Sequence, residues 1–399
     1  MSLKSLMALK PGVSRKEAER VALVIAGIVL LIFAQRGLTA NGLMLNNGEP
    51  IFGDFLAFWS AGKLALAGQA AHVHDQSAIL AMHREALPSL RVIFLWHHPP
   101  TFLLFVTPFA LMPYPAAAIL FLIATGAIYV WGARAILPDA RALIFALAMP
   151  AALFHVGSVQ TGLLVAGLTA LALAWLDKRP IWAGVCIGLL AFKPHLAVLW
   201  PIMLALQGRW RTFGAAAATG VAFVIAAGAV FGFDAYGRFL ANLPNAQSMV
   251  DTLRLSQDTM ASLYANALAL GAPKALALGL HGASALGAVA LACLIWRTHH
   301  AGASAAALAA ATCLISPYIF YYDALLFGVA IAFLAREGVR SGELIWFTLA
   351  WAVAALMLAI GKLAALPLAP LSAWALLIIA ASRAGVTLPA GLRLSRLGG

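Results

Sequence analysis

The chain has 399 residues, of which 63% are hydrophobic and 10% are charged, and its mean hydropathy is +0.94. A soluble domain is about half apolar and about a quarter charged, so this composition excludes a single water-soluble core. The net charge of +12 does not indicate nucleic-acid binding, because the basic residues flank apolar segments instead of covering a soluble face. We therefore predict an all-α polytopic membrane protein whose partner is the lipid bilayer and not a nucleic acid.

Apolar runs, taken in chain order, predict the membrane-spanning helices. No small-residue cleavage site follows the run 21–35, so we expect a retained first helix and not a cleaved signal. A span needs about 20 apolar residues, and on that basis we expect about twelve spans in all. The candidates are 21–35, 116–135, 142–155, 162–176, 181–192, 196–206, 213–231, 275–296, 303–315, 324–335, 344–360 and 366–381.

The distribution of lysine and arginine predicts the orientation of these spans. If the N-terminus is cytoplasmic, most basic residues fall on that same side, as the positive-inside rule expects. This scheme requires that the proline-rich segment "WHHPPTFLLFVTPFALMPYP", 96–115, is re-entrant or lies at the interface. The basic residues on the inner side are then Lys4, Lys10, Arg15, Lys16, Arg20, Arg134, Arg141, Lys178, Arg179, Arg209, Arg211, Arg297, Arg336, Arg340, Arg383, Arg393 and Arg396.

This topology gives one integral membrane domain, 1–399, with two long outer loops. The first, 36–115, is expected to hold amphipathic or re-entrant elements, and the second covers 232–274. The inner loops contain no nucleotide-binding pattern. We therefore expect the chemistry on the outer face of a bacterial inner (plasma) membrane, with both ends of the chain in the cytoplasm.

Asp54 stands among apolar residues in "IFGDFLAFWSAGKLALAG", near the start of a predicted interfacial amphipathic helix. One interpretation is a helix cap, which the helix dipole would favour. The other is a general base at the membrane surface, where aromatic neighbours exclude water and raise basicity. The residues alone leave both interpretations open.

Lys193 lies between two apolar stretches in "LLAFKPHLAVLW". A lysine at membrane depth is costly and by default marks a functional or water-lined site, although it can also extend its amine to the interface. Pro194 breaks the helix there and exposes backbone groups that require a cavity or a partner. The functional interpretation is a cation that binds a phosphate group.

Short outer turns supply further candidates. Gln160 lies in "FHVGSVQTG", for which the alternative is an ordinary polar turn flanked by glycines. Asp323 ends "SPYIFYYD" and opens an apolar run, where a carboxylate indicates a functional site. The tyrosines before it, Tyr322 among them, equally suit an aromatic belt that anchors a helix.

The histidine pairs and the second outer loop carry weaker signals. The stretches "HVHD", 72–75, and "HH", 97–98, are possible metal ligands, but no further ligand spacing completes either of them, so we expect no metal site. The three cysteines lie in apolar segments without paired spacing. In the second outer loop the candidates for sugar or phosphate contacts, of which no spacing singles out one, are Arg238, Asn242, Asn245 and Arg254.

The stretches "GDFLAFWSAGKLALAGQAAHVHD", "HHPPTFLLFVTPFALMPYPAA", "GSVQTGLL", "RPIWAGVCIGLLAFKPHLAVLWPIMLALQGRWR" and "SPYIFYYDALL" occur in the order seen in glycosyltransferase family 87, which the chain resembles over residues 52–334. The pattern combines D-F-x-x-x-W, G-x-x-x-G-L-x-x-x-K-P and P-x-x-x-x-Y-D. Two stretches depart from it. His98-Pro99-Pro100 stands where relatives often have Tyr-Pro-Pro, and Gly-Ser-Val-Gln replaces Gly-Gln.

The resemblance implies a GT-C type bundle and an inverting hexosyltransferase that uses no cofactor. Its donor would be a polyprenyl-phosphate sugar, with mannose as the leading sugar, and its acceptor a lipid or a glycan. Asp54 matches the family's catalytic base, while Lys193, Arg238 and Arg254 would contact the donor phosphate. The substrate-binding candidates are Trp59, His98, Gln160, His195, Tyr322 and Asp323.

Two other classes of function compete with this interpretation. A transporter or flippase of a lipid-linked sugar would need polar residues at mid-membrane and an internal repeat, whereas the charged candidates here gather at one face and no repeat is visible. A non-catalytic scaffold predicts no buried charge at Asp54 or Lys193.

Overall fold

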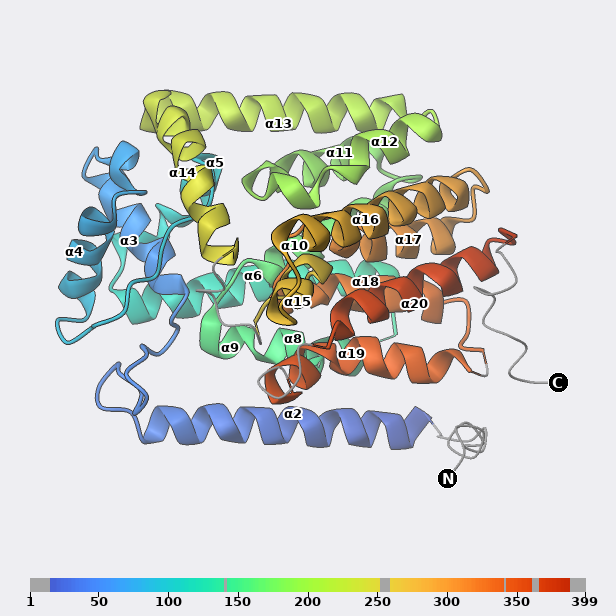
Figure 1. The fold of residues 1–399 in the computed structure, drawn as a ribbon, viewed down its shortest axis with the longest axis horizontal. Coiled ribbons are helices and arrows are strands. Elements are labelled where there is room, and N and C mark those ends of the chain that lie inside the picture. The colour runs from blue at the N-terminus through green and yellow to red at the C-terminus, as the bar shows by residue number, and fades with distance from the viewer. Residues whose placement is uncertain (1–14, 140–141, 252–258, 341, 361–365, 388–399) are drawn as a thin grey trace.

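The computed structural model describes residues 15–139, 142–251, 259–340, 342–360 and 366–387, and within these ranges the chain forms helices and no β-strand (Figure 1). Four helices of this described part are long and apolar enough to cross a membrane. They are α2 (Arg15–Leu38), α6 (Tyr114–Ile136), α13 (Trp210–Phe231) and α16 (Lys274–Trp296). The prediction of an all-α membrane protein is thus confirmed, while the number of spans stays a prediction.

Shorter apolar helices complete the bundle. They pack against the longer ones and are more deeply buried, which suits an internal position in a membrane protein. Their bounds are α10 (Gly162–Trp175), α11 (Pro180–Leu189), α12 (Leu199–Leu206), α17 (Ala301–Ile315), α18 (Leu325–Ala335), α19 (Glu343–Ile360) and α20 (Leu368–Arg383).

Two predicted spans are shaped by proline. The candidate 142–155 is not one helix but three short ones, α7 (Ala142–Leu147), α8 (Pro150–Leu153) and α9 (His155–Ser158). Pro150 has no backbone N–H to donate and forces Met149 into an extended conformation, so the helix cannot continue. The predicted break at Pro194 is confirmed, because two 3₁₀ turns, η3 (Leu190–Phe192) and η4 (Pro194–Leu196), separate α11 from α12.

The region predicted as the first outer loop contains α3 (Phe55–Leu66), η1 (Ala70–His72), α4 (Gln76–Ala86), α5 (Thr101–Val106) and η2 (Phe109–Leu111). Neither α5 nor η2 is long enough to cross a membrane. The placement of 96–115 as a re-entrant or interface-lying element stays a prediction. The expectation that the segment after Asp54 is an amphipathic surface helix is wrong. Most of α3 is buried on all sides, because α4, α5 and α6 cover it in place of lipid headgroups and water.

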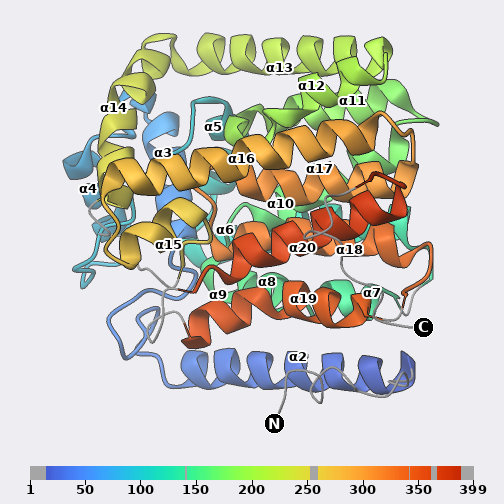
Figure 2. The same cartoon turned by 45° about the vertical axis from the view of Figure 1, so that its right-hand side comes forward.

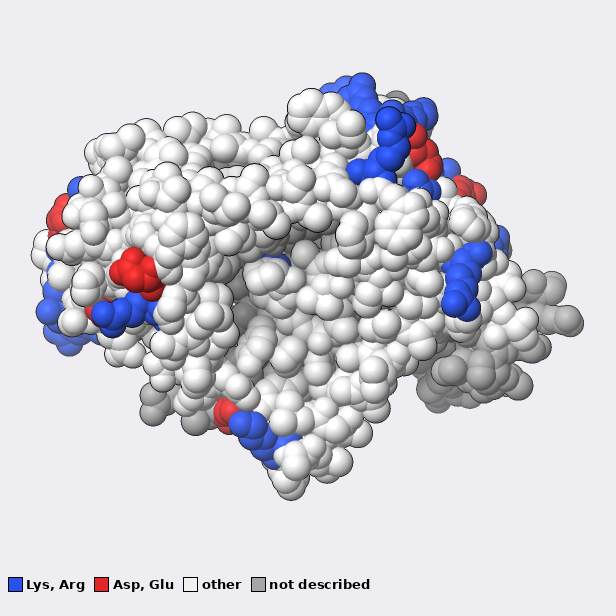
Figure 3. Space-filling model, turned by 90° about the horizontal axis from the view of Figure 1, so that it is seen from above, with Lys and Arg blue, Asp and Glu red and all other residues white. Residues whose placement is uncertain are grey.

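The helix ends collect at two opposite ends of the bundle (Figure 2). One end holds α3 and α4, together with α14 (Asp234–Asp251) and α15 (Leu263–Ala269). The other holds the α10–α11, α12–α13 and α16–α17 turns, which carry many of the basic residues. In Figure 3 most charged side chains lie toward the margins of the visible face, and the broad, hollowed area between them is almost uncharged, with a small patch of Lys or Arg surface inside the hollow. Such a belt suits the hydrocarbon core of a bilayer.

Glycines allow α11 and α13 to pack closely, in the manner of small-residue contacts between membrane helices. A β-carbon added at Gly184 would lie 2.5 Å from the Ala215 Cβ and 2.6 Å from the Thr212 carbonyl oxygen. One added at Gly188 would lie 2.5 Å from the Thr219 Cβ. The two backbones can therefore approach only while these positions carry no side chain.

We expect Gly184→Val to force α11 away from α13 and to destabilise the protein by about 1–3 kcal/mol, the usual cost of overpacking. Thermal unfolding in detergent, followed by the loss of the monodisperse peak in size-exclusion chromatography, measures this. Gly214→Val is the matched control, because nothing lies within 4 Å of a β-carbon added there on α13. Equal losses in the two variants would contradict the packing argument.

Candidate functional site

Asp54 occupies the N-cap position of α3, yet its side chain makes no capping hydrogen bond. The first N–H groups of the helix bond instead to backbone carbonyls, Phe55 N–H to Phe52 O at 3.0 Å and Leu56 N–H to Gly53 O at 3.1 Å. A cap is therefore not needed at this end of the helix. Of the two interpretations that the sequence left open, the helix-cap one is not supported by the geometry.

The Asp54 carboxylate interacts with Gln160 instead. The Gln160 side-chain oxygen accepts the Thr161 N–H at 3.1 Å, so its amide N–H₂ is free to donate to Asp54. Burial raises the pKa of Asp54 to about 6, the Gln160 hydrogen bond offsets part of that rise, and the charge of Glu49 adds to it. A carboxyl group with this pKa is ionised at neutral pH and still basic enough to accept a proton.

Two unusual backbone conformations flank this pair. Phe52 and Val159 both have positive φ angles, of 64° and 52°, and each lies within two residues of a member of the Asp54–Gln160 pair. The left-handed region costs such residues of order 1–3 kcal/mol, most clearly a β-branched one such as Val159. Tyr114 stabilises the first of them, because its hydroxyl donates to the carbonyls of Ile51 at 2.6 Å and Phe52 at 3.0 Å. Strain of this kind is typical of functional sites.

Lys193 and Asp323 form a buried ion pair, with 4% and 1% of each residue exposed. Lys193 Nζ donates to Asp323 Oδ1 at 2.6 Å, and Asp323 Oδ2 accepts the Phe320 N–H at 3.1 Å. The pair joins the break between α11 and α12 to the turn η5 (Tyr321–Ala324), which leads into α18. The ammonium also lies 4.8 Å from the centre of the Tyr322 ring.

Histidines surround the ammonium of Lys193. His98 packs among Phe58, Trp96 and Phe102, and its pKa lies well below the usual value because it is buried and because Lys193 is close. His98 is therefore neutral at pH 7 and can act as a hydrogen-bond donor or acceptor without adding positive charge. His155 and His195 also lie near enough to sense the charge of Lys193.

Several buried polar atoms near this pair have no hydrogen-bond partner among the described residues. They are His155 Nε2, Thr161 Oγ1 and His195 Nε2. The Nδ1 of His155 lies 2.7 Å from the Ala151 carbonyl oxygen, so Nδ1 carries the proton and Nε2 is a free acceptor. Buried polar groups are normally satisfied, and these three are among ten such unpaired atoms in the described residues, so they are available to a polar ligand.

Tyr322 connects the two halves of the site. Its ring is in contact with the Lys193 ammonium, and it lies close enough to both Asp54 and Asp323 to sense their charges. Gly162 allows this approach, because a β-carbon there would collide with the Tyr322 carbonyl oxygen and the His155 ring. We therefore treat Asp54, Gln160, Lys193 and Asp323 with their neighbours as one candidate site.

The structure does not bring every predicted residue to this site. Trp59 is buried in α3, and its indole N–H donates to the Met112 carbonyl at 2.9 Å. Arg238 is exposed on α14, and Arg254 lies outside the described residues. Contacts of these three residues with a substrate stay predictions.

The histidines at 72–75 have structural partners. His72 Nδ1 lies 2.7 Å from Asp75 Oδ2, and His74 Nδ1 lies 3.2 Å from both the Trp96 carbonyl and the Asn242 amide. The last contact joins the first predicted outer loop to α14. Across the ranges that the structure describes, no three His, Cys, Asp or Glu side chains are arranged to hold a metal ion.

Sequence reasoning did not identify Tyr114 and Thr161 as members of the site, and His155 was visible only as a neighbour of Gln160. Tyr114 ends a proline-rich stretch and resembles an interface tyrosine, while Thr161 resembles an ordinary helix N-cap. Thr161 adjoins Gln160, which is the one signal that could have drawn attention to it.

Lys193→Met leaves the Asp323 carboxylate buried without its cation, so we expect a loss of about 3–5 kcal/mol of stability. The double variant Lys193→Met/Asp323→Leu removes both charges and is expected to recover most of that loss. Midpoints of thermal unfolding in detergent compare the two. If the double variant unfolds as early as the single one, Asp323 does not depend on Lys193 for its burial.

Comparison with known proteins gives the family of the chain, although the matched range does not include Asp54. The family model described as Glycosyltransferase family 87 matches residues 96–317, a range that holds His98, Gln160 and Lys193 and ends just before Asp323. A search of curated proteins and a search of solved structures return no significant match. Since the matched range is more than half of the chain, the protein belongs to glycosyltransferase family 87.

Proposed function

We propose that this glycosyltransferase moves a sugar, mannose or another hexose, from a polyprenyl-phosphate donor to a lipid or glycan acceptor. The observation that carries the proposal is Asp54, a carboxylate with a raised pKa that caps no helix, is hydrogen-bonded to Gln160 and shares Tyr322 as a neighbour with the buried Lys193. A carboxylate with a raised pKa commonly acts as a general base, and a nearby cation can stabilise a leaving anion.

In the proposed step Asp54 accepts the proton of the acceptor hydroxyl while that oxygen attacks the anomeric carbon of the sugar. The new C–O bond forms as the bond between the anomeric carbon and the phosphate oxygen breaks, and the lipid phosphate leaves with the electron pair. A single displacement inverts the configuration, so a β-linked donor gives an α-glycoside. Gln160 orients the carboxylate through its amide.

Lys193 can bind the leaving phosphate, but the structure shows that not all of its N–H donors are available, which the sequence did not reveal. Asp323 already occupies one of its three N–H donors and neutralises its charge. The remaining donors can still form charge-assisted hydrogen bonds to phosphate. His195 and the neutral His98 can add uncharged ones, since Nε2 of His195 has no partner among the described residues. In this proposal a fixed ion pair, assisted by imidazoles, takes the place of a metal ion at the phosphate.

The site would face the outside of the cell, with both termini in the cytoplasm and a GT-C type arrangement of spans. Supporting this, α3, whose N-cap is Asp54, lies at one end of the bundle, while the basic turns gather at the other end, as the positive-inside rule requires of the cytoplasmic face (Figure 2). A donor carried by a lipid also suits an enzyme whose inner loops contain no nucleotide-binding pattern.

Asp54→Asn keeps the shape of the side chain but cannot accept the proton, so we expect transfer to fall by about 10²–10⁴-fold. Purified protein in lipid is assayed for transfer from labelled polyprenyl-phosphate sugars to a membrane-lipid extract, with donor binding measured separately and expected to persist. Glu49→Gln is the matched control, because it removes a carboxylate of the same loop that is not hydrogen-bonded to Gln160. Full activity of Asp54→Asn would rule out Asp54 as the general base.

The pH dependence of transfer should report the pKa of Asp54. A general base works when it is ionised, so the rate is expected to fall by about tenfold per pH unit below pH 6 and to level off above it. Glu49→Gln removes a charge that raises the pKa and should shift this limb to lower pH. Gln160→Leu removes a hydrogen bond that lowers the pKa and should shift it to higher pH. Shifts in the same direction would contradict the assignment to Asp54.

A further inference from the structure

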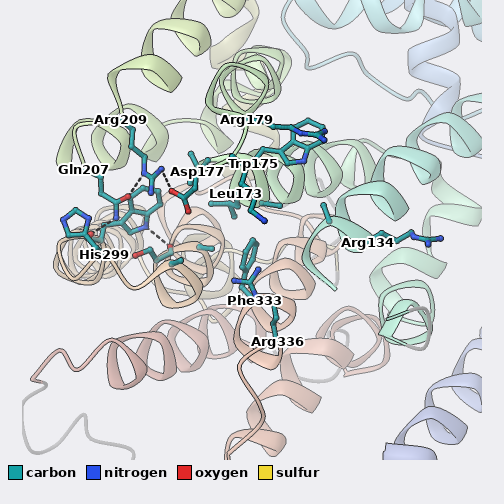
Figure 4. A pocket seen from close by; sticks show the side chains of 18 of the residues that line it. Arg134, Leu173, Trp175, Asp177, Arg179, Gln207, Arg209, His299, Phe333 and Arg336 are labelled. Atoms are coloured by element: carbon teal, nitrogen blue, oxygen red, sulfur yellow. Dashed lines mark hydrogen bonds and ion pairs between the residues drawn. The ribbon is translucent and has the colours of Figure 1, made fainter. Parts of the chain in front are cut away.

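A cavity of about 710 Å³ lies at the end of the bundle where the turns carry many of the basic residues. It is bounded by the C-terminal end of α6, the α10–α11, α12–α13 and α16–α17 turns and the end of α18 (Figure 4). None of the residues of the candidate site around Asp54 and Lys193 lines it. The proposed transfer chemistry leaves this cavity without a role.

The lining of this basic pocket is strongly cationic. Arg134, Lys178, Arg179 and Arg336 line it and form no ion pair with any described residue. The fifth cation, Arg209, is paired with Asp177 at 2.8 Å. Asp177 is the one acidic side chain among the lining residues. The pocket thus carries a positive charge that an anion would neutralise.

Two of the unpaired arginines are held in place by aromatic rings. The Arg179 guanidinium lies 5.6 Å from the centre of the Trp175 ring, and that of Arg336 lies 5.3 Å from the centre of the Phe333 ring. A guanidinium that stacks on a ring keeps its N–H edges free, and a fork of N–H donors matches a phosphate group. Figure 4 shows Arg179 and Arg336 on opposite sides of the space between the turns.

A buried hydroxyl gives a second, independent indication of a ligand. Ser304 lines the pocket from α17 and is only 4% exposed, yet its Oγ has no hydrogen-bond partner in the described part of the chain. By contrast, polar atoms of the nearby Trp296 and Gln207 are hydrogen-bonded. The Ser304 carbonyl accepts the Trp296 indole N–H at 2.7 Å, and the Gln207 amide donates to the Trp296 carbonyl at 2.7 Å.

From this lining we propose that the basic pocket binds a phosphate-bearing anion. The membrane offers such a group in the headgroup of an anionic phospholipid, and basic pockets between helices at the cytoplasmic side suit that headgroup. The place of the pocket favours this source over a free phosphate, because Trp131 at its rim is 55% exposed on the apolar surface of α6 and can contact an acyl chain. A bound headgroup would tie together the end of α6, the three turns and the end of α18.

The test compares the full-length wild-type protein with Arg179→Gln/Arg336→Gln. Neither arginine has an acidic partner among the described residues, so the double variant leaves no carboxylate unpaired. Arg211→Gln is the matched control, since Arg211 is exposed on the first turn of α13 and does not line the pocket. Binding of phosphatidylglycerol, phosphatidylcholine and inorganic phosphate to protein in detergent is followed by native mass spectrometry and by the unfolding temperature.

We expect phosphatidylglycerol to bind and to raise the unfolding temperature more than phosphatidylcholine does. In the double variant its affinity should fall by about tenfold or more, and in Arg211→Gln it should be unchanged. The same pattern with inorganic phosphate alone would support the pocket but assign it to a soluble anion. The proposal is overturned if neither anion binds wild type, or if the double variant and Arg211→Gln bind equally well. Sugar transfer is not a readout here, so failure would leave the proposed function untouched.

Discussion

The ion pair between Lys193 and Asp323 is the interaction on which the rest of the site depends. A charge buried in an apolar protein is tolerated only with a partner, and each of these two residues is the other's partner at 2.6 Å. The pair holds a proline-broken helix against a turn 130 residues further along the chain. Irregular backbone inside an apolar bundle needs polar partners, and this ion pair anchors the irregular turns on both of its sides.

The position of Asp54 follows from the same constraint. Asp323 fixes the turn that carries Tyr322, and Tyr322 lies against the Lys193 ammonium and near enough to Asp54 to sense its charge. On the other side Tyr114 holds the strained loop before α3. Asp54 is thereby kept half-buried, with its side chain bonded to Gln160 and not to the first N–H groups of α3. A preorganised carboxylate of this kind costs stability and is retained where chemistry requires it.

The sequence allowed much of the site to be predicted, because single charges stand out in an apolar chain. Asp54, Lys193 and Asp323 were all identified in this way, and the break at Pro194 followed from the missing N–H of proline. The pairing of Lys193 with Asp323 was not predictable, because the two residues are 130 positions apart and the sequence around each does not indicate its partner. Nor was the role of Tyr114, whose hydroxyl partners are backbone carbonyls about sixty positions away.

The fold could be predicted least well where helices are short. Hydropathy identifies α2, α6, α13 and α16, which are long and largely exposed to the surroundings. It cannot tell a helix at the membrane surface from a buried one such as α3, because the few polar residues of α3, Ser60 and Lys63, suit either position. The prediction of one helix over 142–155 was wrong for a simpler reason. Pro150 was visible in the sequence, but the apolar composition around it was given more weight.

The most direct test of the account is an experimental structure of the Asp54→Asn protein with a polyprenyl-phosphate sugar bound. We predict that the phosphate contacts the Lys193 ammonium and that the anomeric carbon of the sugar faces the side chain at position 54. If the phosphate instead lies at the basic end of the bundle, or if the sugar is out of reach of position 54, Asp54 and Lys193 do not form one site and the proposed mechanism is wrong.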